Sequence, residues 1–165
     1  MLYKCIKIYK NEYLFNRVRN IFLGELKLNI ELTSNDLTID EFSKLRSSVN
    51  LSSLLEEQID RALSNSLYTV CARNNKEAVG MGRLVGDGAY VYYLQNIYVM
   101  PEYQRLGIGS LIINSLLDFI RKDKIEGTDV MVLLMSSKNS EGFYKKFGFR
   151  LRPNKDEGCG MIINM

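Results

Sequence analysis

Two closely spaced glycines, Gly107 and Gly109, stand between a strand-like run at 90–100 and an amphipathic, helix-like run at 111–122. Glycine lets the backbone approach a ligand with no side chain in between. The first amides of a helix lack carbonyl partners, and together with the positive end of the helix dipole they favour a phosphate group. Arg105 adds a positive charge beside them. The order strand, glycine turn, helix therefore predicts a phosphate site at the turn.

The spacing of these glycines excludes two common phosphate-binding motifs. A dinucleotide fingerprint, G-x-G-x-x-G, would need a third glycine at the position of Ile112. A nucleotide-triphosphate loop, G-x-x-x-x-G-K-[S/T], occurs nowhere in the chain. A phosphate site of another kind is therefore expected.

Two strings together resemble one protein family. The run Gln104-Arg105-Leu106-Gly107-Ile108-Gly109 follows a strand-like segment and resembles motif A of the GCN5-related N-acetyltransferases (GNAT). Downstream, the letters GFYKKFGF at 142–149 are similar to that family's F-Y-x-x-x-G-F segment. The strings come in the family's order, and the resemblance runs from about Leu28 to the C-terminus. It implies an α/β fold with a GNAT-type mixed central β-sheet, splayed open beside the strand at 90–100 and flanked by helices.

The same resemblance implies acetyl-coenzyme A (acetyl-CoA) as the acyl donor. Its pantetheine arm would pair like an added strand with backbone groups of 97–99, and its pyrophosphate would rest on the turn at 105–110. A backbone amide, of Tyr98 or Ile97, would polarise the acyl carbonyl. The residues that the resemblance implies in coenzyme binding are Ile97, Tyr98, Val99, Gln104, Arg105, Leu106, Gly107, Ile108, Gly109, Ser110 and Tyr144.

Acetylation of an amine needs two proton transfers. An alkylamine with a pKa of about 10.4 is almost fully protonated at neutral pH and must lose a proton before it attacks the thioester. The leaving thiolate must gain one. Tyr144 matches the tyrosine that the family commonly uses as this acid, and the plainer alternative is a helix tyrosine that only packs on the coenzyme.

The base is where the chain departs from the family's pattern. Many relatives carry Asp or Glu shortly before the valine that corresponds to Val99, but none of the residues found here can act as a base: Gln95, Asn96 and Ile97. Water held by Asn96 and its neighbours could pass the proton to solvent. Alternatively, Glu56 or Glu57 could reach the site, although a solvated helix face is the simpler interpretation of both. Glu102 is a further candidate, nearer the expected phosphate entrance.

Three charged residues could contact the acceptor. Arg83 could bind an acceptor carboxylate, or it could simply be a charge on a strand face. Asp156 and Glu157 lie in a polar, glycine-rich stretch at 153–161, which predicts a loop over the acceptor mouth that attracts a cationic amine.

Composition limits the class of protein. The chain has 165 residues, 46% apolar and 25% charged, which predicts a soluble globular protein. A net charge of +3 is too small to indicate a nucleic-acid partner, and no apolar stretch is long enough to span a membrane. Residues 1–10 mix lysines with apolar residues and lack the continuous apolar centre of a signal peptide, so none is expected. Three widely spaced cysteines indicate reduced thiols in the cytoplasm. The absence of histidine excludes Ser-His-Asp or Cys-His catalysis and a histidine-ligated metal, so we expect no metal.

The first 25 residues form an N-terminal extension of unknown role, outside the predicted acetyltransferase domain at 26–165. A strand is predicted at 2–9, and a helix at 11–23. Because the extension carries many large apolar residues that one small domain need not cover, a homodimer is predicted.

Strands alternate with helices through the rest of the chain, which predicts an α/β sheet. Helices are predicted from Ile39, with Thr38 as N-cap, to about Val49, from Ser52 or Ser53 to Leu63, at 111–122 and at 140–146. Strands are predicted at 28–32, 67–72, 78–85, 90–100, 130–135, 149–151 and 160–164. The strand at 130–135 is fully apolar, which predicts that both of its faces are covered.

Three functions are compatible with these observations. The first is an acetyl-CoA-dependent N-acetyltransferase that acts on the primary amine of a small molecule. The second takes a lysine or the N-terminus of a protein as acceptor. The third is a catalytically silent acyl-coenzyme A-binding or regulatory module, which the missing carboxylate favours and Tyr144 disfavours.

Overall fold

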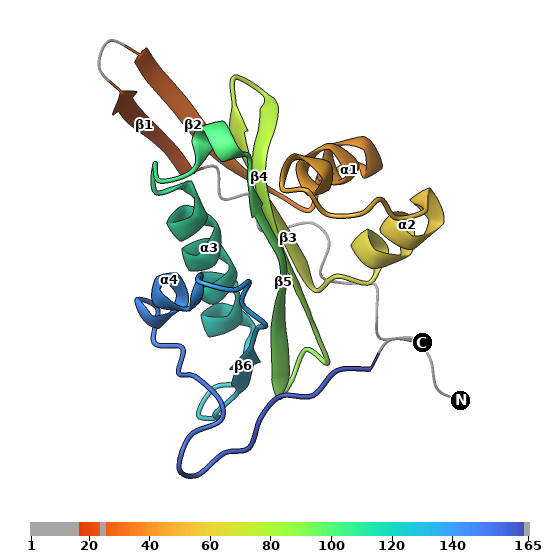
Figure 1. The fold of residues 1–165 in the computed structure, drawn as a ribbon, viewed down its shortest axis with the longest axis vertical. Helices are drawn as coiled ribbons and strands as arrows, with labels where there is room; N and C mark the ends of the chain where they lie inside the picture. The colour runs from red at the N-terminus through yellow and green to blue at the C-terminus, as the bar shows by residue number, and fades with distance from the viewer. Residues whose placement is uncertain (1–16, 24–25, 164–165) are drawn as a thin grey trace. The chain divides into compact units, whose positions relative to one another are not determined.

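A computed structural model describes residues 17–23 and 26–163 of the chain (Figure 1). The chain divides into two compact units, 1–133 and 134–165. The first unit contains β1 (Arg17–Leu23), β2 (Leu26–Ser34), α1 (Ile39–Ser48), α2 (Glu56–Ser64), β3 (Tyr68–Asn74), β4 (Glu77–Gly86), β5 (Val91–Val99), a 3-10 turn (Pro101–Tyr103), α3 (Ile108–Asp123) and β6 (Met131–Leu133). The second contains α4 (Glu141–Lys145).

The six strands form one mixed sheet in the order β1-β2-β3-β4-β5-β6. Neighbours pair antiparallel except β5 and β6, which are parallel. β6 pairs only with the start of β5, from Val91↔Met131 to Tyr93↔Leu133. In the described part of the chain, the rest of β5 therefore has a strand partner on one side only. The predicted α/β fold with a splayed, mixed sheet is confirmed.

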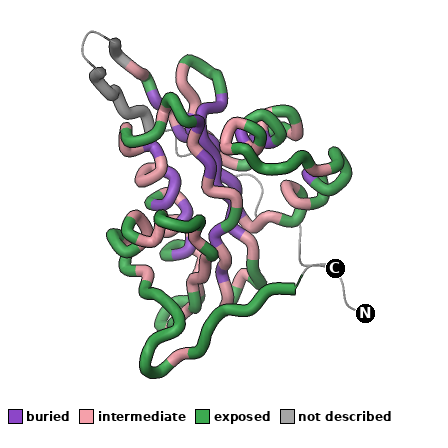
Figure 2. Tube along the Cα trace, viewed as in Figure 1, coloured by how far each residue is buried: buried purple, intermediate pink, exposed green. Residues whose placement is uncertain are grey.

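Helices cover the two faces of this sheet. α1 packs on β4 and β5, and α3 packs on β3, β4 and β5 on the opposite side (Figure 1). On the side of α1, the core includes Phe42, Leu45, Ile59, Met81 and Tyr98. On the other side, α3 buries Ile108, Ile112, Ile113, Leu116 and Ile120. Figure 2 shows this burial concentrated along the central strands and the inner side of α3.

The start of α1 agrees with the sequence. The Thr38 hydroxyl accepts a hydrogen bond from the Glu41 amide at 3.2 Å, and the Glu41 carboxylate accepts one from the Thr38 amide at 3.0 Å. This reciprocal capping box satisfies two amides that the helix itself cannot. The predicted N-cap is confirmed, and the helix ends at Ser48 with Val49 as C-cap.

The start of α2 was predicted too early. Ser52 and Ser53 lie in a link without regular secondary structure, and the helix begins at Glu56, where the Gln58 side chain accepts from the Leu55 amide at 3.0 Å. The link is held by Arg46, whose Nε donates to the Ser52 carbonyl at 2.5 Å. Arg46 belongs to α1, so the residues around Ser52 do not by themselves indicate this contact.

The predicted helix at 11–23 is wrong over its described part. Residues 17–23 form β1, which pairs with β2 from Arg17↔Leu32 to Leu23↔Leu26. Pairing with a neighbouring strand outweighs a local helical pattern. The predicted strand at 2–9 and the first part of that helix lie outside the described residues. The homodimer stays a prediction.

Three predicted strands near the C-terminus differ from the structure. β6 spans only 131–133, and Met131 is 39% exposed. The prediction that both faces of this strand are covered is therefore wrong. It pairs over three residues with β5 alone. The described residues at 149–151 and 160–163 contain no strand. Arg150 instead forms an ion pair with Glu157, which holds 150–157 as a loop.

The described helices include none that is long and apolar enough to cross a membrane. Among the described residues, no group of three or more Cys, Asp or Glu side chains is arranged to hold a metal ion. Cytoplasmic localisation stays a prediction.

Gly82 of β4 provides a test of the packing between the sheet and α3. A Cβ at this position would lie 2.6 Å from Ile112 Cγ2 and 3.0 Å from Ile97 Cδ1. Because the neighbours must shift, Gly82→Ala is expected to lower the free energy of unfolding by about 1–3 kcal/mol, measured by urea denaturation. Gly142→Ala is the control, since nothing lies within 4 Å of its Cβ. Equal stability of the two variants would contradict this packing.

Candidate functional site

β5 carries a bulge at Asn96. Arg83 pairs with Gln95 and Met81 pairs with Tyr98, so two residues of β5, Asn96 and Ile97, oppose Gly82 alone. Asn96 has a φ of 52°, a left-handed conformation that asparagine tolerates better than most residues. A bulge bends its strand and interrupts the ladder. It lies beyond the point where β6 stops pairing, so β5 is both bent and open there.

The backbone groups of β5 alternate in direction after the bulge. The Met100 amide donates to the Val79 carbonyl at 2.9 Å. In an antiparallel ladder, every second residue faces its partner, so the polar groups of Tyr98 face β4 and those of Val99 face the open edge. The Val99 carbonyl accepts a hydrogen bond from Gln104 Nε2 at 2.9 Å. The Val99 amide is thus directed to the open edge.

The turn before α3 leaves amides without partners. Arg105 and Gly107 adopt left-handed conformations, with φ of 61° and 83°. Gly107 is the N-cap and provides no side-chain cap, and the first turn has no acidic residue. The Leu111 amide donates to the Gly107 carbonyl at 3.1 Å, so the three amides before it, of residues 108–110, have no acceptor within the helix. The turn has the features of an anion site.

Asn96 is fixed by hydrogen bonds at both ends of its amide. Arg83 Nε donates to Asn96 Oδ1 at 2.8 Å, and Asn96 Nδ2 donates to the Tyr98 hydroxyl at 2.6 Å. Arg46 Nη1 also donates to that hydroxyl, at 3.1 Å. The Tyr98 ring packs edge-on against Phe42, with centroids 6.5 Å apart. Asn96 therefore positions Tyr98 rather than removing protons.

Arg83 is a buried cation in this network. It is 8% exposed, and its Nη1 donates to the Ala62 carbonyl and, at 3.0 Å, to the Ser66 hydroxyl near the end of α2. Burial lowers the pKa of its guanidinium. None of its hydrogen bonds goes to a carboxylate. Sequence reasoning named Arg83 but missed Arg46, because a basic residue in the last turn of a helix usually only complements the dipole.

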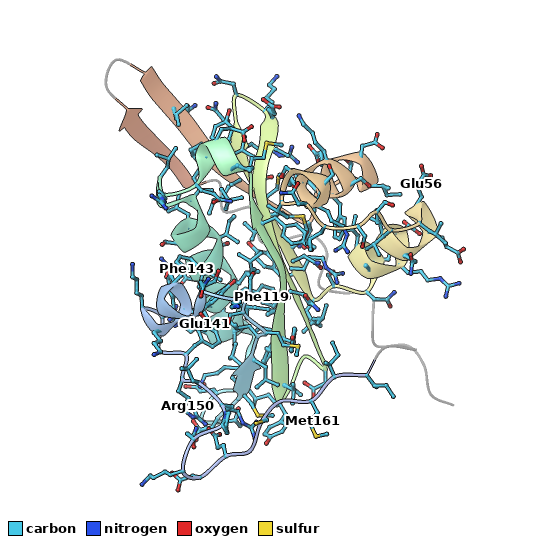
Figure 3. All side chains as sticks on the ribbon, in the orientation of Figure 1. Glu56, Phe119, Glu141, Phe143, Arg150 and Met161 are labelled. Carbon is cyan, nitrogen blue, oxygen red and sulfur yellow. The ribbon has the colours of Figure 1, made fainter. Side chains whose placement is uncertain are left out.

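The carboxylates considered as bases do not join this network. Glu57 forms an exposed ion pair with Arg61 at 2.7 Å. Glu56 is exposed at the start of α2 (Figure 3), and Glu102 is exposed in the 3-10 turn. None of the three has a hydrogen bond with Asn96 or Tyr98. A solvated helix face remains the simpler interpretation of Glu56 and Glu57.

Tyr144 belongs to the second unit, on α4. Its ring lies edge-on to Phe143 and Phe149, with centroids 5.1 and 6.2 Å away. Burial raises the pKa of its phenol, which therefore stays protonated at neutral pH. Its hydroxyl has no hydrogen-bond partner among the described side chains and backbone groups. A protonated phenol with an unused donor suits a general acid.

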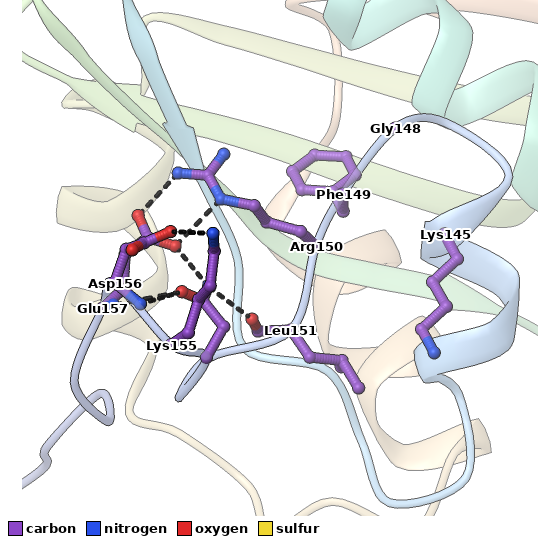
Figure 4. Close-up of a pocket in the computed structure, with 9 residues that line it drawn as sticks. Lys145, Gly148, Phe149, Arg150, Leu151, Lys155, Asp156 and Glu157 are labelled. Atoms are coloured by element: carbon purple, nitrogen blue, oxygen red, sulfur yellow. Dashed lines mark hydrogen bonds and ion pairs between the residues drawn. The ribbon is translucent and has the colours of Figure 1, made fainter.

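The predicted loop at 153–161 is organised by its own ion pair. Arg150 donates to the two carboxylate oxygens of Glu157 at 2.9 and 2.5 Å, and Asn154 Nδ2 adds a bond at 2.6 Å. These bonds lower the pKa of Glu157 to about 2. Arg150, Asn154 and Glu157 are among the residues that line the surface pocket in Figure 4. The negative charge of Glu157 is therefore already balanced by Arg150, which argues against its predicted attraction of a cationic amine. Asp156 is exposed.

Comparisons with known proteins agree with this geometry. A family model for the acetyltransferase (GNAT) domain matches residues 33–162. The uncharacterised N-acetyltransferase ycf52 of Pyropia yezoensis is 27% identical, covering 79% of this chain and 75% of its own length. The chloroplastic serotonin N-acetyltransferase 2 of Oryza sativa subsp. japonica is 23% identical over 78% of this chain, which spans 64% of that relative. A crystal structure of a probable acetyltransferase of unknown function from meticillin-resistant Staphylococcus aureus is 31% identical, with a TM-score of 0.73, covering 82% of this chain and 99% of that one.

Proposed function

Because this chain belongs to the GNAT family and is an N-acetyltransferase, we propose that it moves an acetyl group from acetyl-CoA directly to the primary amine of a small molecule. The observation that carries the proposal is the open, bulged edge of β5 together with the uncapped start of α3. The first suits an extended amide-containing chain, and the second suits a pyrophosphate.

Direct transfer is favoured over an acetylated enzyme. The chain has no histidine to activate a cysteine. Of the described cysteines, Cys159 is exposed and has no histidine to activate it, and Cys71 is buried, which raises the pKa of its thiol to about 12. The Cys71 thiol is therefore almost never ionised at neutral pH and is a poor nucleophile. The acceptor amine is therefore the group that attacks the thioester.

The donor would be held mostly by backbone atoms. The Val99 amide is available to the pantetheine arm. The Val99 carbonyl already accepts a hydrogen bond from Gln104, which connects the turn to the strand. Since the Tyr98 amide is directed toward β4, we infer that the Ile97 amide, next to the bulge, polarises the acyl carbonyl. The pyrophosphate would bind the amides from Arg105 to Ser110.

The proposed reaction moves protons at the acceptor nitrogen and at the departing sulfur. The ammonium form of the acceptor gives a first proton to water, and the free amine attacks the thioester carbon. The C–N bond forms as the C–S bond breaks, and the nitrogen gives a second proton to water, which leaves a neutral amide. The departing coenzyme A thiolate then takes the proton of the Tyr144 hydroxyl, which the solvent replaces.

A small acceptor is supported by a relative that is named as a serotonin N-acetyltransferase. The test is release of free coenzyme A thiol with a panel of polyamines, amino acids and arylalkylamines, beside lysine peptides. Turnover of small amines supports the proposal. Turnover of peptides alone would identify a protein acetyltransferase, and binding without turnover would identify a silent module.

The rate is expected to depend on the free-amine fraction of the acceptor. With no carboxylate bonded to Asn96, the rate should climb through alkaline pH without a plateau near 7. The climb should move with the pKa of the amine when two acceptors of different pKa are compared. Replacing both Glu56 and Glu57 by glutamine should leave the profile unchanged. A neutral plateau that this double variant abolishes would assign the base to α2.

A further inference from the structure

Two arginines next to the bulge lack acidic partners. Arg46 and Arg83 are joined through Asn96 and Tyr98 by the three hydrogen bonds described above. Neither arginine forms an ion pair with a carboxylate in the part of the chain that the structure describes. By contrast, Arg73, on the same sheet, is paired with Glu41 and Asp36. Removing the Arg83 guanidinium from water without an opposite charge is costly, so this site, with the half-buried Arg46 beside it, is poised for an anion.

Each guanidinium has a hydrogen-bond donor that no described residue uses. Arg83 uses Nε and Nη1, and Arg46 uses Nε and Nη1, so the Nη2 of each has no partner among the described atoms. The only fully buried side-chain N or O atom without a partner in the described chain is Asn74 Oδ1. Neither Nη2 atom is therefore fully enclosed by the described residues, and the proposed site uses this remaining access.

The position of the pair matches the side from which an acceptor must approach. Ile97 and Gly82 face α3, whose Ile112 and Leu116 fill that side of the sheet. Arg83, Asn96 and Tyr98 face α1 and α2 instead. An amine that reaches a thioester lying along the edge of β5 would come from this second side and would meet the two guanidinium groups.

We propose that the acceptor is an amine that also carries a carboxylate, and that Arg46 and Arg83 bind this carboxylate. The inference rests on the proposed N-acetyltransferase function. It accounts for a buried arginine that otherwise has neutral partners only. Arg83 also bonds the end of α2, but that role uses Nη1 and leaves Nη2 available.

The test compares acceptors that differ by one carboxylate, tyramine with tyrosine and putrescine with ornithine, by thiol release. Since amine pKa differs within each pair, the decisive quantity is the change in the kcat/KM ratio between wild type and variant, in which substrate ionisation cancels. Arg46→Gln is expected to lower the preference for the carboxylated member about 10- to 100-fold, the usual effect of a charged hydrogen bond. Arg83→Gln should act in the same direction.

Arg61→Gln is the matched control, because it removes the same charge from an exposed site on α2. It should leave the ratio unchanged, and Arg46→Lys should restore part of the preference. An unchanged ratio in both Arg46→Gln and Arg83→Gln would overturn the inference. So would a folded wild type that shows no preference for the carboxylated members once each kcat/KM value is corrected for the free-amine fraction of its acceptor.

A binding measurement separates this inference from the proposed function. Calorimetry with coenzyme A present should show that N-acetyltyrosine binds more tightly than N-acetyltyramine, and that Arg46→Gln removes the difference. If no amine is turned over but this difference holds, the proposed function fails and the carboxylate site stands. If amines are turned over, but neither the affinity difference between the two products nor the kcat/KM ratio of the substrates depends on Arg46 or Arg83, only the carboxylate site fails. Absence of both turnover and an Arg46-dependent difference overturns the two together.

Discussion

Replacement of Tyr144 by phenylalanine is expected to slow acetyl transfer about 10²- to 10⁴-fold, the usual effect of a positioned acid. The variant keeps the ring and its edge-on contacts with Phe143 and Phe149, so folding and coenzyme binding should persist. Because burial raises the pKa of the phenol, its proton is present throughout the neutral range. Single-turnover kinetics, which isolate the chemical step from product release, measure the effect.

Tyr90→Phe is the control for this experiment. Tyr90 is 60% exposed just before β5, so loss of its hydroxyl should not change the rate. If Tyr144→Phe turned over at the wild-type rate, the thiolate would take its proton from water, and Tyr144 would only pack on the coenzyme.

Replacement of Gly107 by aspartate is expected to weaken acetyl-CoA binding by on the order of 10²-fold, since charged hydrogen bonds are lost and a like charge is added. At φ 83°, a residue with a Cβ is strained, and the new carboxylate would stand where the first amides of α3 favour an anion. Calorimetry gives the dissociation constant. The melting temperature should rise with acetyl-CoA in the wild type and little in the variant.

Gly88→Asp is a matched control for both strain and charge. Gly88 has a similar φ of 72°, and its Cβ would meet only Leu67 Cδ2, at 3.8 Å. It should lose stability and still bind acetyl-CoA normally. A folded Gly107→Asp protein with an unchanged dissociation constant would contradict the placement of the pyrophosphate.

Local signals predicted those parts of the molecule whose cause is local. The capping box of α1 lies within four residues, from Thr38 to Glu41, and the structure shows both of its hydrogen bonds. The glycine turn before α3 is also short, and Gly107 adopts the left-handed conformation that makes glycine useful there. The alternation of strands and helices predicted an α/β sheet, whereas the resemblance to the acetyltransferase family predicted that the sheet is mixed.

Contacts between distant residues explain what the sequence did not predict. Arg46 meets Tyr98 across 52 positions, and nothing in the neighbourhood of Arg46 marks that contact. β1 is a strand because β2 pairs with it, although its own residues suit a helix equally well. The left-handed Asn96 was unexpected too, since asparagine inside a β-rich run does not by itself indicate a bulge.

The uncapped start of α3 and the open edge of β5 have a consequence for how this enzyme can change over evolutionary time. In the proposed arrangement, main-chain atoms hold the donor, so most side chains around it can be replaced while its recognition persists. The acceptor would instead be chosen by a few side chains, Arg46 and Arg83 among them. Single substitutions on that side can then redirect the enzyme to a new amine while the donor machinery stays intact.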